Sequence, residues 1–325
     1  MEPLQGTLCR RNGTRALCLE IEVNSTQTSI DTWPVWRGQL STFKVTIVFL
    51  LHILVLFAPL TYRRLEFSLS ILTIYVTLQC GLVLGYHRLL THRCFATYTW
   101  LKRALSLVGT LAMQDGPISW VAIHRTHHRI AEQPFDPHSP KNGFLWAHLF
   151  WIFFEHPRLS QSERILIARD LHGDSFIRFC EERFILLNTA ATAGVFLIGF
   201  GIGGLSRAFS FLVWIVAVRT VCLWHVTFLV NSVGHTMGYR NFDTPDDSHN
   251  VWILGVLALG DGWHNNHHAF PACAAHGRRW FEIDFTYLFI LILERCGLAW
   301  NVQHAALIRS SHSQRYRPKE AGSAG

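Results

Sequence analysis

The sequence is poor in charged residues and lacks the patterns of several protein classes. Asp, Glu, Lys and Arg make up only 16% of its 325 residues, while 50% are hydrophobic. The eight cysteines contain no C-x-x-C pair, so neither a zinc knuckle nor a dithiol redox motif is indicated, and free thiols are expected. No glutamate is followed three residues later by histidine, which excludes the Glu-x-x-His di-iron site of helical bundles.

Two further absences concern the polar parts of the chain. The first forty residues lack the basic start, apolar middle and small-residue cleavage site of a secretory signal peptide. The basic residues form no stripe interleaved with aromatic rings, so no nucleic-acid partner is expected. The formal net charge of +7 instead favours contact with anionic lipid headgroups.

Long apolar runs dominate the rest of the sequence. Crossing a bilayer as a helix takes about 20 apolar residues, and flanking residues can complete shorter runs. Four such runs occur in two closely connected pairs, Val45–Leu60 with Phe67–Tyr86 and Phe184–Leu205 with Ala208–Val230. They predict an all-α membrane protein with four transmembrane helices in two hairpins. The alternative is a large soluble protein with buried helices, in which paired runs of this length are uncommon.

An even number of crossings places both termini and the long middle segment on one side of the membrane. That side carries most of the Lys and Arg residues, so the positive-inside rule makes it the cytoplasmic side. We expect a loosely ordered polar segment over 1–43, a membrane-embedded domain over 44–302 and a polar tail over 303–325.

The histidines gather in short motifs at the predicted cytoplasmic ends of the spans. The motifs are HRLLTH, HRTHH, the end of NSVGH, and HNNHH, and they contain His87, His92, His124, His127, His128, His235, His264, His267 and His268. Helical residues at i, i+3 and i+4 share a face, so each HxxHH motif can direct three rings to one place. The first two histidines, five residues apart, lie about 140° apart on an ideal α-helix, so we expect the helix to end or unwind between them.

Nine imidazoles near a membrane surface predict metal binding. Burying them uncharged and unpaired would leave many polar groups unsatisfied. One ion accepts roughly four to six nitrogens, so nine rings suit a dinuclear site of iron, zinc or copper. We expect a structural role, with one backbone carbonyl as partner, for the isolated histidines His52, His156, His172, His304 and His312.

These motifs, with DPHSPKNGFLWAH and GRRWFEIDFTYLFI, resemble those of the integral-membrane fatty acid desaturases. The resemblance covers about residues 45 to 302 and is to the Δ9 branch, the stearoyl-CoA and cyanobacterial acyl-lipid type. It implies a four-span desaturase domain with a cytoplasmic helical cap, a narrow acyl tunnel and two iron ions that activate O2. It further implies a fatty acyl substrate, as acyl-CoA or acyl-lipid, and a separate electron donor such as ferredoxin or a cytochrome b5-like protein.

Individual roles also follow from the resemblance. It implies that the nine histidines are the metal ligands, that Asn231 reaches one metal through a water, and that Gln114, Trp120 and Thr227 line the bend of the tunnel. Asp261 stands where many members of the family have glutamate, a change that the sequence does not explain. His138 and His148 belong to family motifs outside the ligand set.

Other polar residues near the motifs or within the spans need partners. His225, inside the fourth span, is expected to bond across helices, and Arg219 to face the tunnel or another helix. Metal-bound imidazoles usually have outer partners that orient them. The candidates near the motifs are Asp136, Asp261, Asn265 and Asn266.

The chemistry leaves rival functions open. A methylene C–H is not acidic, so its hydrogen is removed by a metal–oxygen oxidant and not by a side-chain base. The same metals could serve a lipid or alkane hydroxylase, which would leave an alcohol. A zinc transporter should place its ligands near mid-membrane, and a haem carrier needs paired histidines on facing spans.

Overall fold

The computed structural model describes the backbone of residues 8–11 and 14–17, and residues 38–305. The chain divides into two units, residues 1–34 and 35–325. The first unit contains an antiparallel hairpin of β1 (Leu8–Arg11) and β2 (Thr14–Leu17), which the sequence analysis did not predict. The rest of the polar N-terminal segment up to residue 37, and the tail from 306 with His312, lie outside the described residues.

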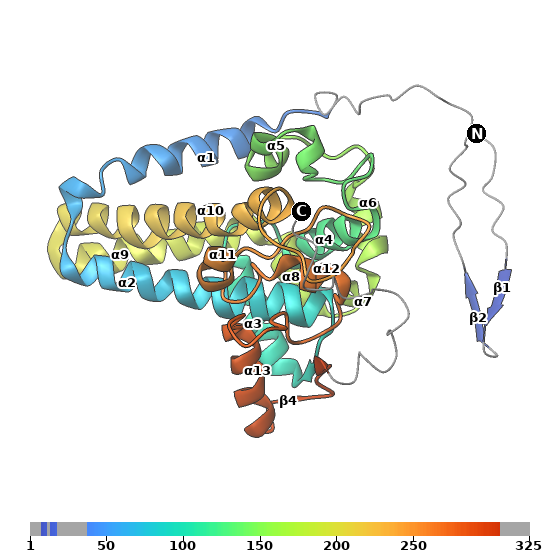
Figure 1. The fold of residues 1–325 in the computed structure, drawn as a ribbon. Helices are drawn as coiled ribbons and strands as arrows, with labels where there is room; N and C mark the ends of the chain where they lie inside the picture. Colours follow the sequence, from blue (N-terminus) through green and yellow to red (C-terminus); the bar gives the residue numbers. More distant parts are fainter. Residues whose placement is uncertain (1–7, 12–13, 18–37, 306–325) are drawn as a thin grey trace. The chain divides into compact units, whose positions relative to one another are not determined.

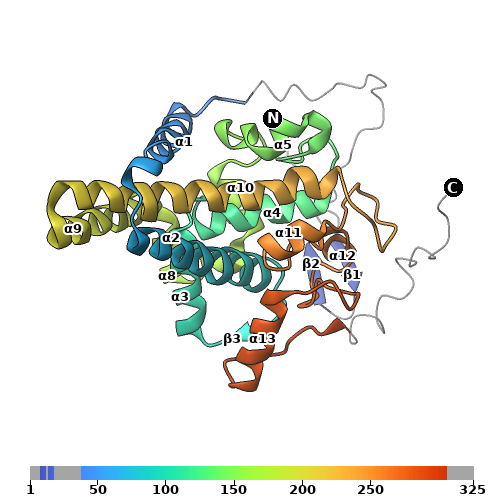
Figure 2. The same cartoon turned by 60° about the vertical axis from the view of Figure 1, so that its left-hand side comes forward.

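Long helices make up one end of the second unit. They are α1 (Thr42–Val55), α2 (Arg64–Val76) with its π-helical continuation Thr77–Thr91, and α9 (Phe184–Phe211), which continues through a π-helical stretch, Leu212–Val218, into α10 (Arg219–Ser232). Figures 1 and 2 show α1, α2, α9 and α10 extending together away from α4 and α12. The domain is therefore mostly helical, as expected.

Two of these helices are long and apolar enough to cross a membrane. Arg64–Thr91 has 28 residues and Phe184–His235 has 52, and each has a mean hydropathy of 1.9 over its best window. Of the four apolar runs in the sequence, two lie within the 52-residue helix, and the first corresponds to α1, which has only 14 residues. Large apolar side chains such as Leu197, Ile198 and Leu205 are exposed on the longer helix, as suits contact with lipid.

The 52-residue helix reverses direction at a glycine pair. Gly203 and Gly204 have non-helical dihedral angles, and Gly204 has φ +67° and ψ −160°. A Cβ built on Gly199 would lie 2.8 Å from the Cα of Ala208. Nine residues of straight helix span about 13.5 Å, so this contact requires the chain to fold back. The pair therefore joins two helical arms into the second hairpin (Figure 1).

Replacing Gly204 by alanine should destabilise this hairpin. The observed dihedral angles lie in a region that is essentially restricted to glycine, and occupying it costs other residues about 1–3 kcal/mol. Thermal unfolding of the purified protein measures the effect. Gly201→Ala is the matched control, because Gly201 is helical and a Cβ there meets open space. Equal stability of the two variants would contradict the proposed strain.

The helix that carries His87 ends between the two histidines of its motif, as expected. It continues as a π-helix through Thr91, and the backbone N–H of His92 donates to the carbonyl of His87 at 3.1 Å. Hydrogen bonds from i+5 to i bring residues five apart over one another. The expected end or unwinding between His87 and His92 is therefore confirmed, and the wider π-helical turn brings the two rings to a centroid distance of 4.8 Å.

Short helices surround the other end of the long helices. They are α3 (Thr99–Thr110), α4 (Pro117–Ile130), α5 (Phe144–His148), α6 (Gln161–Ile167), α7 (Arg169–His172), α8 (Ser175–Glu182), α11 (Trp252–Leu257), α12 (His264–Ala269) and α13 (Phe285–Arg295). A second antiparallel pair joins β3 (Ala96–Thr97) to β4 (Ala299–Trp300). Single turns of 3-10 helix cover Pro59–Thr61, Pro140–Asn142, Phe150–Phe153 and Val233–His235.

The π-helix is the centre of the apolar core. Its side chains Leu82, Leu84 and Tyr86 are buried, and Ile118 and Val121 of α4 belong to the same core. The hydroxyl of Tyr86 lies 3.1 Å from that of Thr110, and the Tyr86 ring leaves no room for a side chain at Gly109. Close packing of α3 and α4 on the π-helix brings two of the histidine motifs together.

Candidate metal centre

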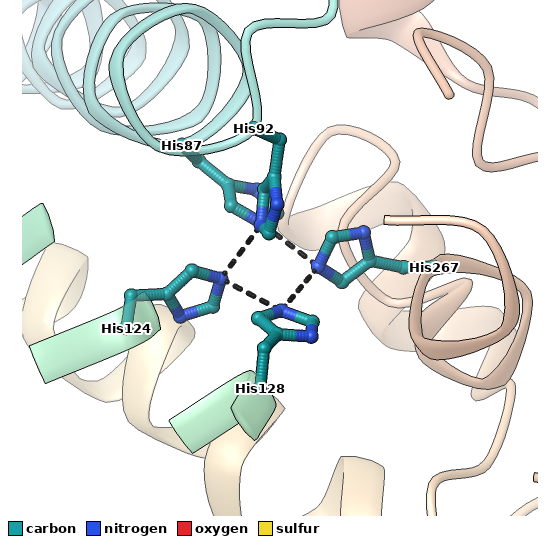
Figure 3. A group of neighbouring side chains, drawn as sticks. All are labelled: His87, His92, His124, His128 and His267. Atoms are coloured by element: carbon teal, nitrogen blue, oxygen red, sulfur yellow. Dashed lines mark hydrogen bonds between the residues drawn. The ribbon is translucent and has the colours of Figure 1, made fainter. Parts of the chain in front are cut away.

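The nine histidines of the motifs meet in two groups. Five rings have nitrogens within 4.8 Å of one another: His87, His92, His124, His128 and His267 (Figure 3). Four more do so in the second group: His127, His235, His264 and His268. Helices α4 and α12 each contribute rings to both groups, because residues at i, i+3 and i+4 fan across one helix face.

The spacing within the first group fits a metal ion. The Nε2 atom of His267 lies 3.0 Å from that of His87 and 2.8 Å from that of His128. The Nε2 atom of His124 lies 3.1 Å from those of His128 and His92. Two metal–nitrogen bonds of about 2.1 Å at a right angle separate their nitrogens by about 3.0 Å. The nitrogens therefore lie where the ligands of one ion would.

The second group contains a buried lone pair without a partner. The Nε2 atoms of His264 and His235 are 2.9 Å apart, and those of His268 and His264 are 3.1 Å apart. In its neutral form His127, with its Nδ1–H directed to Asp136, carries a lone pair on Nε2, and this buried atom has no hydrogen-bond partner among the described residues. Such a lone pair costs about 1–3 kcal/mol unless a cation accepts it. The donor set thus fits a second metal ion.

Four carboxylates contact rings of the two groups at Nδ1, the nitrogen that faces away from the other rings of the group. Each accepts from an Nδ1 atom, in the pairs His87–Asp261 at 2.8 Å and His127–Asp136, His235–Glu132 and His268–Asp246 at 2.9 Å. A hydrogen bond at Nδ1 fixes the tautomer and leaves the Nε2 lone pair for the metal. The four rings are therefore oriented as ligands.

Electrostatics act on both partners of these pairs: burial opposes protonation of His127, but the charge and hydrogen bond of Asp136 raise its pKa. Burial alone would raise the pKa of Glu132, but hydrogen bonds from His235 and from the backbone of Asp247 lower it to about 2. Burial also opposes ionisation of Asp136, yet the charge and hydrogen bond of His127 hold its pKa well below the ordinary value. Burial and neighbouring rings lower the pKa of six imidazoles, so they are neutral and can bind a cation: His92, His124, His128, His264, His267 and His268.

The outer partners differ in part from those expected. Asp136 and Asp261 contact histidine rings, as expected, whereas the two asparagines of HNNHH form no hydrogen bond with any of the nine rings. Asn265 accepts from the backbone of residues 241 and 242, and Asn266 donates to Glu282, so both hold α12 in place. Glu132 and Asp246 were not predicted, because they lie 103 and 22 positions from the histidines they contact and follow no motif spacing.

The three residues expected at the tunnel bend form one polar group beside the first cluster. Gln114 Nε2 donates to Thr227 Oγ1 at 2.5 Å, and Trp120 Nε1 donates to Gln114 Oε1 at 3.4 Å. The Trp120 ring stacks on His124 with centroids 5.1 Å apart. Asn231, half-buried, lies one helical turn before His235. Their roles toward substrate and metal stay predictions.

Histidines outside the two groups have other partners. His52 Nδ1 lies 2.7 Å from the carbonyl of Val48, and His156 Nε2 lies 3.0 Å from that of Phe135, as expected of structural histidines. His225 bonds across elements, as predicted, to His52 at 3.2 Å and His148 at 2.9 Å.

Two other structural expectations fail. His304 instead contacts the Tyr287 hydroxyl at 3.0 Å and Glu294 at 3.2 Å. The buried Nδ1 of His172 has no hydrogen-bond partner among the described residues. The expectation for Arg219 is met, because this buried residue donates to the carbonyl of Leu111 between α3 and α4.

The helices bring nine imidazoles into two groups, each of which could hold a metal ion. The family model for fatty acid desaturases matches residues 65–288, more than half of the chain. The chain belongs to the fatty acid desaturase family, and it is an oxidoreductase of that class.

Three relatives illustrate the family. An sn-1 stearoyl-lipid 9-desaturase of Anabaena variabilis is 41% identical over 80% of this chain and 93% of its own. An acyl-CoA 5-desaturase of Anemone leveillei is 40% identical, over 84% of this chain and 82% of its own. An sn-2 palmitoyl-lipid 9-desaturase of a Nostoc strain is 36% identical, over 81% and 90%. These relatives differ in acyl carrier and in the position of the double bond.

Proposed function

We propose that this protein is a membrane-bound desaturase that inserts a cis double bond at the Δ9 position of a saturated acyl chain carried by a glycerolipid. The observation that carries the proposal is the pair of imidazole groups beside the polar group of Gln114, Trp120 and Thr227. Two of the three relatives described above are lipid 9-desaturases, which supports both the carrier and the position.

The two histidine groups would hold two iron ions, with Asn231 reaching one through a water. When bound, the iron pair would activate O2, and this supplies the oxidant that removes hydrogen from unactivated methylenes. The nine rings supply the ligand nitrogens, and the four carboxylates orient the four rings that they contact. Burial of most of these rings excludes water, which protects the reaction from side products.

The reaction balances with a separate reductant. One –CH2–CH2– unit, O2, two electrons and two protons give –CH=CH– and two water molecules. The two electrons come from a one-electron donor protein, a ferredoxin or a cytochrome b5-like protein. Basic residues on the cytoplasmic face are suited to an acidic donor of this kind.

The membrane arrangement follows the two hairpins. We place four spans in α1, α2 with its π-helix, and the two arms that meet at Gly203 and Gly204. Exposed apolar side chains on these helices support lipid contact. The metal centre and both termini then lie on the cytoplasmic side, as the distribution of basic residues indicates.

Expression in a host without Δ9 unsaturation tests the function. Fatty acids are identified by mass spectrometry, with His267→Ala as the inactive control. We expect a Δ9 monounsaturated product only with the unaltered chain. A hydroxylated product would favour the histidine-rich hydroxylase instead, and the absence of any new product would reject the proposal.

Replacing Trp120 by alanine should reduce the yield or shift the position of the double bond. The indole stacks on His124 and donates to Gln114. Its removal would take away part of the tunnel wall, and that wall fixes which carbons approach the metals. Product positions are read by mass spectrometry of derivatised fatty acids. Trp280→Ala is the control, because this tryptophan is 93% exposed. Unchanged yield and position in Trp120→Ala would refute the role.

A further inference from the structure

Four side chains behind His87 form a closed circuit of polar contacts. Asp261 Oδ2 accepts from His87 Nδ1 at 2.8 Å. Asp261 Oδ1 lies 3.3 Å from Arg88 Nη2 and 3.3 Å from His276 Nδ1. Arg88 binds Asp284 through both guanidinium ends, at 3.1 and 3.2 Å. Asp284 then accepts from the backbone N–H of His276 at 2.7 Å, which closes the circuit.

The circuit is buried and carries charge. Arg88 and His276 are 0% exposed, and Asp284 is buried as well. A buried guanidinium is tolerated only with well-placed acceptors, which here are two carboxylates and the carbonyl of Ala274. One positive and two negative groups leave a net negative charge beside the five-histidine group. Such a charge favours a cation at that group.

The members come from four separate stretches of chain. Arg88 lies in the π-helix, Asp261 precedes α12, His276 follows it, and Asp284 caps α13 by accepting from the backbone N–H of Tyr287 at 2.9 Å. The circuit therefore ties both flanks of α12 to the helix that carries His87.

His276 also touches the metal centre. Its ring centroid lies 4.3 Å from that of His267 and 5.5 Å from that of His87. Both of its ring nitrogens are buried, and neither makes a hydrogen bond in the part of the chain that the structure describes, although Nδ1 lies 3.3 Å from Asp261 Oδ1. The ring thus packs behind two members of the first group while its Nδ1 faces Asp261.

We propose that Arg88, His276 and Asp284 are positioning residues. They fix the carboxylate of Asp261 and, through it, the ring of His87, so that Nε2 of His87 faces the metal. This inference rests on the proposed function, because it treats the five-histidine group as a metal site. Supports of this kind matter because displacement of a ligand by about 0.5 Å impairs a metal site.

A double-mutant cycle tests the proposal. Asp261→Asn, His276→Gln and the double variant are compared with the unaltered full-length protein for Fe²⁺ affinity, measured by competition of metal-free samples with a chromophoric chelator. Asp261→Asn should weaken binding about 10–100-fold, and His276→Gln about tenfold. The double variant should bind no more weakly than Asp261→Asn alone, because His276 acts through that carboxylate.

The controls separate positioning from stability. His304→Gln replaces another histidine that contacts a carboxylate, and its Fe²⁺ affinity should be unchanged. Arg88→Lys keeps the charge but loses the two-ended contact with Asp284, so it should weaken Fe²⁺ binding as much as His276→Gln does. If His276→Gln does not fold, Arg88→Lys takes its place in the comparison.

Three results would overturn the inference. The first is additive loss in the double variant, and the second is a lowered melting temperature of metal-free His276→Gln with unchanged Fe²⁺ affinity. The third is a loss of affinity in His304→Gln equal to that in His276→Gln. A wild-type protein that binds no iron would instead overturn the proposed function, and this inference with it.

Discussion

Replacing His267 by alanine should abolish desaturation and remove about half of the bound iron. Of the three rings on α12, this one belongs to the five-histidine group, and its Nε2 atom lies within 3.0 Å of those of His87 and His128. Its removal opens the side of the group that faces α12, while the four-histidine group keeps all its nitrogens. Iron should therefore fall from about two ions to about one per chain.

Elemental analysis of the purified protein and mass spectrometry of its products measure the two effects. His156→Gln is the control, because its ring contacts the carbonyl of Phe135 and belongs to neither histidine group. That variant should keep its iron and its product. Full iron content or persisting desaturation in His267→Ala would contradict the assignment of this ring as a ligand.

The sequence alone could predict which rings gather, because their spacing is carried by local motifs. HRTHH and HNNHH lie on helices, where the i, i+3, i+4 spacing specifies a shared face without knowledge of the fold. How the rings divide between the two groups could not be predicted. That division depends on the approach of α4 to α12, which long-range packing decides.

Local geometry limited the prediction in another way. The spacing of His87 and His92 predicted that the helix ends or unwinds between them, which it does, but it did not predict the π-helix over Thr77–Thr91 that brings the two rings together. The outer carboxylates show a third limit. Glu132 meets His235 only because the loop after α4 packs against the end of α10, and no short-range pattern reports such contacts.

Asp261 illustrates what the structure adds to a motif. Its departure from the glutamate of many family members had no explanation in the sequence. In the structure the shorter carboxylate is held between His87, Arg88 and His276. The surroundings of a residue next to a motif are thus made by partners from other stretches of chain.

Replacing Asp136 by asparagine should weaken metal binding at the four-histidine group about 10–100-fold. Asp136 Oδ1 accepts from His127 Nδ1 at 2.9 Å, and Oδ2 accepts from the backbone N–H of Glu132 at 2.7 Å. His127 holds the pKa of this buried carboxyl well below its ordinary value, so the group is ionised throughout the neutral range. An amide carries no charge to stabilise the ring as a ligand, and its NH2 group can turn toward Nδ1 and reverse the tautomer.

Fe²⁺ titration of the metal-free protein checks this effect, with Asp243→Asn as the control on an exposed aspartate. Because the pKa of Asp136 is depressed in the folded protein, its ionised form contributes stability above the ordinary pKa and loses that contribution as the pH falls. The variant should therefore be less stable than the unaltered protein at neutral pH, and the difference should shrink in acid. Equal Fe²⁺ affinity in both proteins would show that His127 keeps its orientation without the carboxylate.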